Sequence, residues 1–245
     1  MMPPTFPLDL APPDLPALIL LFASWYAIGW LIEHPPARRP SVSVLMTRFR
    51  TAWMAHFVSR QPRIFDANIL TTLREGTSFF ASACMIATGG LLALIGNADR
   101  LRGLTEGIDF VEGAGPGTGL IRAKLLVVMF FVVNAFLKFV WAHRLFGYCA
   151  VTMASVPNDA DDPVAMARAM QAADLNITAA RSFNAGLRSV YFAIGSLAWL
   201  AGAWALAAGT LVVLFVTWRR EFASTSRRVL MRNLPQPGRG APPPG

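Results

Sequence analysis

Two polar residues interrupt an apolar stretch near the middle of the chain, and they are the first candidates for function. Asn134 and Lys138 are four positions apart within residues 125–141, so a helix places them on one face. An ionisable side chain inside a membrane span usually faces the protein interior or a water-filled cavity. Two simpler interpretations stay open, because Lys138 can extend its amine to the nearby interface and Asn134 can simply bond to a neighbouring helix.

Further polar residues are expected at the same membrane surface. Asp66 is the natural acidic partner for Lys138 or for an arginine. Together these residues can bind an anionic lipid headgroup, form a transport gate or lock the helices to one another. The complete candidate polar cluster is Arg63, Asp66, Asn134, Lys138, Arg144, Asn184, Arg188 and Tyr191.

Motifs for catalysis and for cofactors are absent from the sequence. It contains no phosphate-binding glycine loop, zinc signature or serine-nucleophile motif. The three histidines are scattered, and Cys84 and Cys149 fall in separate apolar helices without a pairing pattern. We therefore expect no metal and no cofactor, and an enzyme ranks third among the candidate functions. The net charge of +8 is better explained by loops facing anionic lipid than by nucleic acid.

The elements that position these residues are membrane helices. The chain has 245 residues, of which 54% are hydrophobic and 15% charged, against roughly 25% charged in soluble domains. Four stretches approach the length of a membrane span: residues 15–32, 76–96, 125–141 and 189–218. They do not alternate polar and apolar residues as barrel strands do. The sequence therefore predicts an all-α, polytopic transmembrane bundle.

The arginines predict the orientation of the bundle. Residues 34–75 hold seven arginines against Asp66 and Glu75, whereas residues 97–119 are acidic. Because basic loops stay in the cytoplasm, the first connection is expected inside and the N-terminus outside. The basic tail after residue 218 returns to the cytoplasm only if residues 189–218 form a hairpin, with a bend near residues 199–204. We predict five crossings of an inner membrane, with one long tilted helix as the alternative for the last stretch.

A basic amphipathic helix is predicted within the first connection. Apolar residues recur at three- and four-residue steps after Ser43, and arginines occupy other positions of the same helix. Such a helix suits a membrane surface, so the candidate lipid-contact residues are Arg48, Arg50, Trp53 and Arg60. Alternatively, this helix covers the cytoplasmic ends of neighbouring spans, and both readings can hold together.

Several short motifs resemble the domain-of-unknown-function 599 family of bacterial and plant membrane proteins. The matching pieces are Arg63-Ile64-Phe65-Asp66 with Asn68, Phe79-Phe80-Ala81-Ser82, Phe136-Leu137-Lys138-Phe139-Val140-Trp141 with Arg144 and Tyr148, Asn184-Ala185-Gly186-Leu187-Arg188 with Tyr191-Phe192, and Arg219-Arg220-Glu221-Phe222-Ala223-Ser224. Relatives often have a proline near the middle of the last apolar stretch, where this chain has Gly202 and Ala203. The resemblance implies an architecture and no particular reaction.

These observations lead to one function hypothesis and one alternative. We expect a single transmembrane domain over residues 1–234 and a disordered Pro/Gly-rich tail over residues 235–245. The leading hypothesis is a non-enzymatic inner-membrane bundle whose basic cytoplasmic layer binds anionic lipid or a protein partner, with a homo-oligomer as a further option. The alternative is a small transporter or channel that uses Asn134, Lys138 and Asp66.

Overall fold

The computed structural model describes residues 10–100 and 117–232, and regular structure in these ranges is entirely helical. The five long helices are α1 (Asp14–Glu33), α3 (Ile64–Gly96), α5 (Thr118–Ala154), α6 (Ala165–Leu197) and α7 (Ala203–Phe222). The other elements are α2 (Val42–Ser59), the 3-10 turn η1 (Ala198–Ala201) and α8 (Thr225–Leu230). The all-α prediction is confirmed for these ranges, whereas the predicted disordered tail, 235–245, lies outside the described residues.

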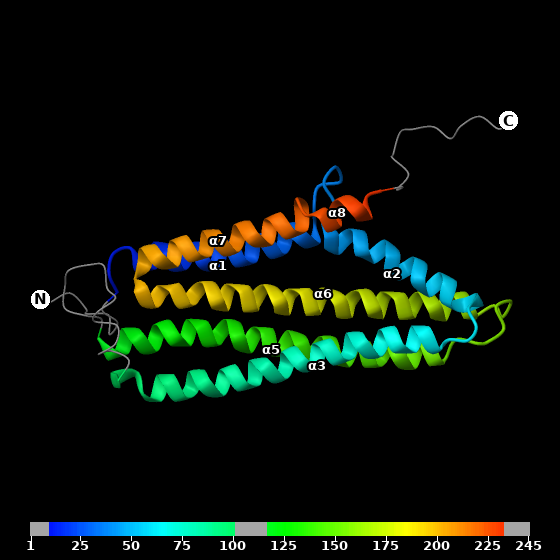
Figure 1. Cartoon of the computed structure of the whole chain (residues 1–245), viewed down its shortest axis with the longest axis horizontal. Coiled ribbons are helices and arrows are strands. Elements are labelled where there is room, and N and C mark those ends of the chain that lie inside the picture. Colours follow the sequence, from blue (N-terminus) through cyan, green and yellow to red (C-terminus); the bar gives the residue numbers. More distant parts are fainter. Residues whose placement is uncertain (1–9, 101–116, 233–245) are drawn as a thin grey trace, which may run out of the picture.

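The long helices lie side by side and alternate in direction (Figure 1). Helices α1, α5 and α7 run one way, and α3 and α6 run the other way. Helix α5 packs against both α6 and α3, and α7 packs beside α1. We call the end at which α1, α5 and α7 begin the Gly202 end, and the end that carries α2 and α8 the α2 end.

The last apolar stretch is a helical hairpin, and its bend lies where the sequence predicted it. After α6 and η1 the chain reverses at Gly202, whose φ is 106°. Glycine adopts this backbone conformation readily, whereas other residues are strained in it. The two arms pack closely, because a Cβ on Gly209 would lie only 3.0 Å from the carbonyl oxygen of Gly195. A single tilted helix over residues 189–218 is therefore excluded.

Within the described ranges, three helices, α1, α3 and α5, are long and apolar enough to cross a membrane. Large apolar side chains are exposed along them and along α7, and we call this set the apolar belt. Its members include Leu15, Ile19, Tyr26 and Trp30 on α1, Phe79, Ile86 and Leu92 on α3, Leu126, Leu137 and Trp141 on α5, and Trp204, Leu211 and Phe215 on α7. Exposed apolar surface of this extent indicates that the chain is a membrane protein.

The bundle is longer than a bilayer is thick. Helices α3 and α5 have 33 and 37 residues, or roughly 50 Å and 56 Å of helix, against a hydrocarbon core of about 30 Å. The continuous part of the belt ends near Phe79 on α3 and Trp141 on α5, and both helices continue beyond it toward the α2 end, where only Ile64, Phe65, Tyr148 and Val151 are further exposed large apolar side chains among their described residues. A second buried cluster fills this extension, and it includes Met54 and Phe57 of α2, Phe146 of α5 and Ala169 of α6.

Candidate functional site

The eight residues of the predicted polar cluster are spread along the bundle and do not form one site. Ser189 Oγ donates a hydrogen bond to Asn134 Oδ1 at 3.0 Å, which fixes the level at which α6 lies against α5. Lys138, Asn184 and Arg188 are within five positions of these two residues, or less than about two helical turns. These residues form the mid-bundle group, whereas Arg63 and Asp66 lie much nearer the α2 end.

Asp66 is separated from Lys138 along the bundle axis. Thr77 Oγ1 lies 3.2 Å from His143 Nδ1, so these residues of α3 and α5 are at one level. From that level Asp66 is eleven positions toward the α2 end, and Lys138 is five positions toward the Gly202 end. Sixteen positions of helix correspond to about 24 Å. Asp66 therefore does not share one short path with Asn134 and Lys138.

Asp66 pairs with an arginine, which was one of its two expected partners. Its side chain is fully buried, and Oδ1 accepts hydrogen bonds from Trp53 Nε1 at 2.6 Å and from Arg60 Nη1 at 2.5 Å. Trp53 lies in α2, and Arg60 is the residue that follows the last turn of α2. Asp66 lies in the first turn of α3. A buried carboxylate with charged and neutral donors locks two elements together, since separating them would leave its charge unpaired.

Three members of the mid-bundle group, Asn134, Lys138 and Arg188, line a crevice of about 370 Å³ between α1, α5 and α6. Arg188 Nη2 lies 2.8 Å from Glu33 Oε1 on one side of this crevice. Lys138 and Asn134 line it from α5, and Lys138 is exposed. The crevice therefore contains one paired cation and one exposed cation, a combination that can attract an anion from the membrane surface.

Asn184 joins a different contact, one that ties together the start of α2 and the end of α7. Its Nδ2 lies 3.4 Å from Ser43 Oγ. Glu221 accepts from the Ser43 backbone N–H at 3.0 Å and from Ser43 Oγ at 3.1 Å. Because a carboxylate is favourable at a helix N-terminus, Glu221 stabilises the first turn of α2. Sequence analysis missed this role, although Glu221 is the only acidic residue of the basic tail.

Arg144 and Tyr191 lie in two separate pairs on the surface. Arg144 Nε donates to Tyr148 Oη one turn later on α5, with the guanidinium 5.5 Å from the ring centre. Arg220 of α7 donates to Tyr191 Oη, with the guanidinium 5.4 Å from the ring centre. The structure therefore brings neither residue into contact with Lys138 or Asp66.

The predicted lipid-contact residues are mostly engaged within the protein. Trp53 and Arg60 bind Asp66, and Arg50 Nη1 donates to Asn176 Oδ1 of α6. Burial lowers the pKa of the Arg50 guanidinium from its ordinary value, although an arginine remains charged in proteins. Of the four predicted lipid-contact residues, Arg48 is the one that is exposed and has no side-chain partner among the described residues. The reason is that α6 packs along α2, and apolar residues of α2 lie in the second buried cluster.

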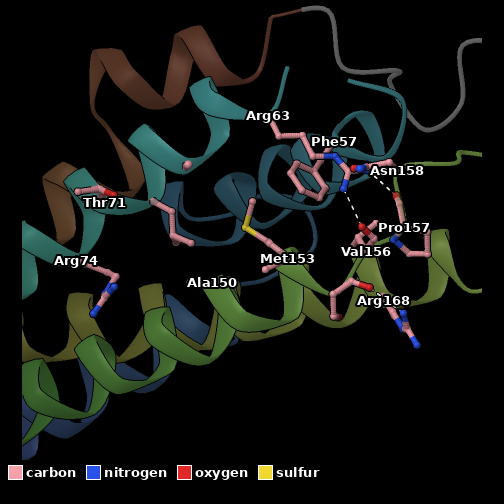
Figure 2. A pocket seen from close by; sticks show the side chains of 14 residues that line it. Phe57, Arg63, Thr71, Arg74, Ala150, Met153, Val156, Pro157, Asn158 and Arg168 are labelled. Carbon is pink, nitrogen blue, oxygen red and sulfur yellow. Dashed lines mark hydrogen bonds between the residues drawn. The ribbon is translucent and has the colours of Figure 1, made fainter. Parts of the chain in front are cut away.

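Beyond the belt, a trough of about 640 Å³ runs between α3 and α5 and is closed by the start of α6 (Figure 2). Arginines line it at both ends, and Leu70, Ala150 and Met153 lie between them. No acidic residue is among its lining residues. We call it the arginine trough and define it by Arg63, Leu70, Arg74, Ala150, Met153 and Arg168.

Two arginines of the trough are held by main-chain carbonyls. Arg63 donates to the oxygens of Val156 and Pro157 at 2.8 and 2.7 Å, and its guanidinium lies 4.4 Å from the ring centre of Phe57. Arg168 Nη1 donates to the Ser155 oxygen at 2.8 Å. These contacts satisfy carbonyls at and just beyond the end of α5, which have no partner within that helix.

Arg74 differs from the other two arginines because its guanidinium makes no hydrogen bond or ion pair with a described residue. It follows Arg63 by eleven positions, about three turns, and so lies on the same face of α3. Sequence analysis selected Arg63 but missed Arg74 and Arg168. The eleven-residue spacing was a signal for the first pair, whereas Arg168 joins them only through the packing of α6.

The Gly202 end carries a buried polar contact of its own. Trp199 Nε1 donates to Asp14 Oδ1 at 2.7 Å, and Lys124 Nζ lies 5.9 Å from the Trp199 ring centre. All three side chains are buried. Within residues 10–100 and 117–232, no group of three His, Cys, Asp or Glu side chains is arranged to hold a metal ion.

Comparisons with known proteins identify a family and suggest no activity. No curated protein and no solved structure matches the chain. The sequence model of one family, described as "Protein of unknown function, DUF599", matches residues 16–226. This match covers the long helices apart from the first two residues of α1, so the chain belongs to the DUF599 family.

Proposed function

We propose that the chain crosses the inner membrane five times and binds anionic lipid headgroups at its arginine-rich α2 end. The observation that carries this proposal is the segregation of charge between the ends of the bundle. The connections and helices at the α2 end include Arg38, Arg39, Arg48, Arg219 and Arg228, all exposed. The described residues of the Gly202 end contribute only Arg100 and Arg122 as exposed arginines.

The charge asymmetry supports an N-terminus outside and a C-terminus in the cytoplasm. Short segments rich in arginine stay inside, so the α2 end is cytoplasmic in this proposal. The alternating directions of α1, α3, α5, α6 and α7 are consistent with five crossings. Helix α6 needs little lipid-facing surface, because Phe192, Ala193 and Ser196 are buried by its neighbours. Helix α7 is uncharged from Ala203 to Trp218, or about 24 Å, which is short for a crossing.

The lipid-binding surface that we propose differs from the one expected at the sequence level. It is a basic collar of exposed arginines around the α1–α2 connection and the end of α7, formed by Arg38, Arg39, Arg48 and Arg219. Trp218 lies next to Arg219 and, with Arg39 and Arg227, lines a hollow of about 440 Å³. Tryptophan and arginine together are typical of the headgroup region of a bilayer. The alternative ligand of the basic collar is a protein partner.

The test is lipid binding by a collar variant in which all four arginines become glutamine. The full-length protein in neutral detergent is titrated with a labelled anionic phospholipid at low and high salt. Each interfacial arginine contributes about 1 kcal/mol of attraction to an anionic surface. We expect the variant to bind more than about tenfold more weakly and with less salt dependence. Arg100→Gln with Arg122→Gln, at the Gly202 end, is the control. Equal binding by parent and collar variant would reject the proposal.

Transport is a second candidate, and the mid-bundle crevice is the observation that favours it. Asn134 and Lys138 line this crevice together with Arg188, whereas Asp66 lies about 24 Å further along the axis. A transport path would therefore use the first pair without Asp66. Flux of anions into proteoliposomes, compared between the parent and Lys138→Ala, tests this candidate. Absence of flux in the parent would reject it.

A further inference from the structure

The arginine trough carries positive charge that the protein itself does not neutralise. Its lining contains Arg63, Arg74 and Arg168 and no acidic residue. Carbonyl oxygens accept hydrogen bonds from Arg63 and Arg168, but they do not remove the positive charge. Arg74 has no side-chain partner among the described residues, and Arg63 Nε is buried without a hydrogen-bond partner there. A cavity that gathers cations in this way is suited to an anion.

Main-chain contacts fix the far end of the trough before any ligand arrives. The two terminal nitrogens of Arg63 bond to carbonyl oxygens, and Phe57 stacks against the guanidinium. Figure 2 shows Phe57 and Arg63 together above the end of α5, with Arg168 on the other side of the trough. A fixed guanidinium loses little freedom when it binds, which favours recognition of a polar group of the ligand at this end of the trough.

The trough is elongated, and apolar side chains lie between its basic ends. The eleven positions between Arg63 and Arg74 correspond to about 16 Å along α3. Leu70 and Met153 lie between them, and Ala67, Ala150 and Ala154 leave room because their side chains are small. A volume of about 640 Å³ falls within the range of small-molecule sites, which is roughly 300–1,000 Å³.

We propose that the arginine trough binds a phosphate ester, with the phosphate near Arg74 and the rest of the polar group directed toward Arg63 and Arg168. This site is separate from the basic collar and does not depend on it. Arg74 precedes the belt residue Phe79 by five positions, or about 7.5 Å of helix. That distance places Arg74 at the depth of lipid headgroups, so a phosphate ester can reach it from the membrane or from the cytoplasm.

The test uses calorimetric titration of the full-length protein in nanodiscs of neutral lipid. The two probes are glycerol phosphate, which has no acyl chain, and a short-chain phosphatidic acid. Binding of both at similar affinity would identify the phosphate group as sufficient and a soluble ligand as the source. Binding of the lipid alone would identify a membrane ligand. If neither probe binds to the parent protein, the proposal is wrong.

Variants locate the bound probe. Arg74→Gln with Arg168→Gln removes two cations and retains Arg63, whose contacts support the fold. We expect the dissociation constant to rise at least about tenfold, since charge-assisted hydrogen bonds are lost. Arg100→Gln with Arg122→Gln, at the Gly202 end, should bind both probes as the parent does. Equal weakening of glycerol phosphate binding by the collar variant and by the trough variant would assign this probe to no single site and overturn the proposal.

A charge-neutral variant tests the cavity itself. Ala154→Trp places a large ring in the trough at the end of α5, where the native residue is exposed. Ala52→Trp, on the exposed face of α2, is the matched control. We expect Ala154→Trp to weaken binding at least about tenfold because it fills the site, while Ala52→Trp has no effect. Unchanged affinity in Ala154→Trp would show that the probe does not occupy the trough.

Discussion

The two ends of the bundle bury an aspartate in the same way and differ in what surrounds it. At the Gly202 end, Asp14 accepts a hydrogen bond from Trp199 Nε1 at 2.7 Å, and at the α2 end Asp66 accepts one from Trp53 Nε1 at 2.6 Å. Only Asp66 has an arginine, Arg60, as a second partner. The shared indole–carboxylate contact therefore explains how each end is locked. The exposed arginines of the collar, which form no ion pair with a described residue, are what distinguish the α2 end as the proposed binding face.

Asp66→Ala should have the largest effect on stability, because it removes the acceptor for both Trp53 and Arg60. We expect the free energy of unfolding to fall by roughly 2–4 kcal/mol, in the lower part of the range for buried pairs because the Arg60 side chain is 35% exposed. Denaturant unfolding in mixed micelles measures the loss. Asp174→Ala, at an exposed position of α6, is the control. A loss no greater than that of the control would show that the contact does not lock the α2 end.

Asp14→Ala should have the next largest effect and act at the opposite end. It leaves the buried Trp199 indole without its acceptor, and a hydrogen bond to a charged group contributes about 1.5–3 kcal/mol. Trp199→Phe removes the same bond from the other side. If the bond is the cause, the double variant should lose less than the sum of the two single losses. Strictly additive losses in the unfolding free energy would argue against it.

Gly202→Ala tests the hairpin. The φ of 106° is strained for alanine, and such strain costs about 1–3 kcal/mol. Gly90→Ala is the control, because a Cβ there meets no atom within 4 Å and alanine favours the helix. The unfolding free energy should fall in the first variant and not in the second. Equal stability of both variants would indicate that the positive φ is not required.

Arg48→Gln should have the smallest effect on stability and a clear effect on binding. The side chain is exposed and has no partner among the described residues, so the change in unfolding free energy should stay within about 0.5 kcal/mol. Binding of anionic phospholipid should still weaken, whereas Arg122→Gln at the Gly202 end should leave it unchanged. If both variants weaken binding equally, the two ends do not differ in the way that we propose.

Much of the fold could be predicted from the sequence. The length of each apolar stretch and the number of arginines in each connection can be read from continuous segments, without knowing which residues make contact. The hairpin followed from the uncharged length of residues 189–218 and the basic tail, and its bend near residues 199–204 followed from the glycine and tryptophans there. Gly202 is the reversal point. The course of α2 could not be predicted in the same way. Its amphipathic pattern shows that one face must be covered, but the same pattern fits a bilayer and a neighbouring helix.

The candidate site was less predictable than the fold, because packing decides which charges meet. Asp66 had two plausible partners in the sequence, and the contact between α2 and α3 selected Arg60. Arg74 and Arg168 are 94 positions apart and line one cavity only because α6 returns alongside α5. A single sequence does not indicate the spatial distance between two residues that are so far apart along the chain.

Labelling of single cysteines from each side of the membrane tests the central claim most directly. Cys84 and Cys149 are buried, so new cysteines at Asp99, near the Gly202 end, and at Ser226, in α8, can report the two sides. A membrane-impermeant maleimide should label Asp99→Cys in right-side-out vesicles and Ser226→Cys in inside-out vesicles. Labelling of both positions from the same side would contradict five crossings and the cytoplasmic position of the arginine-rich end.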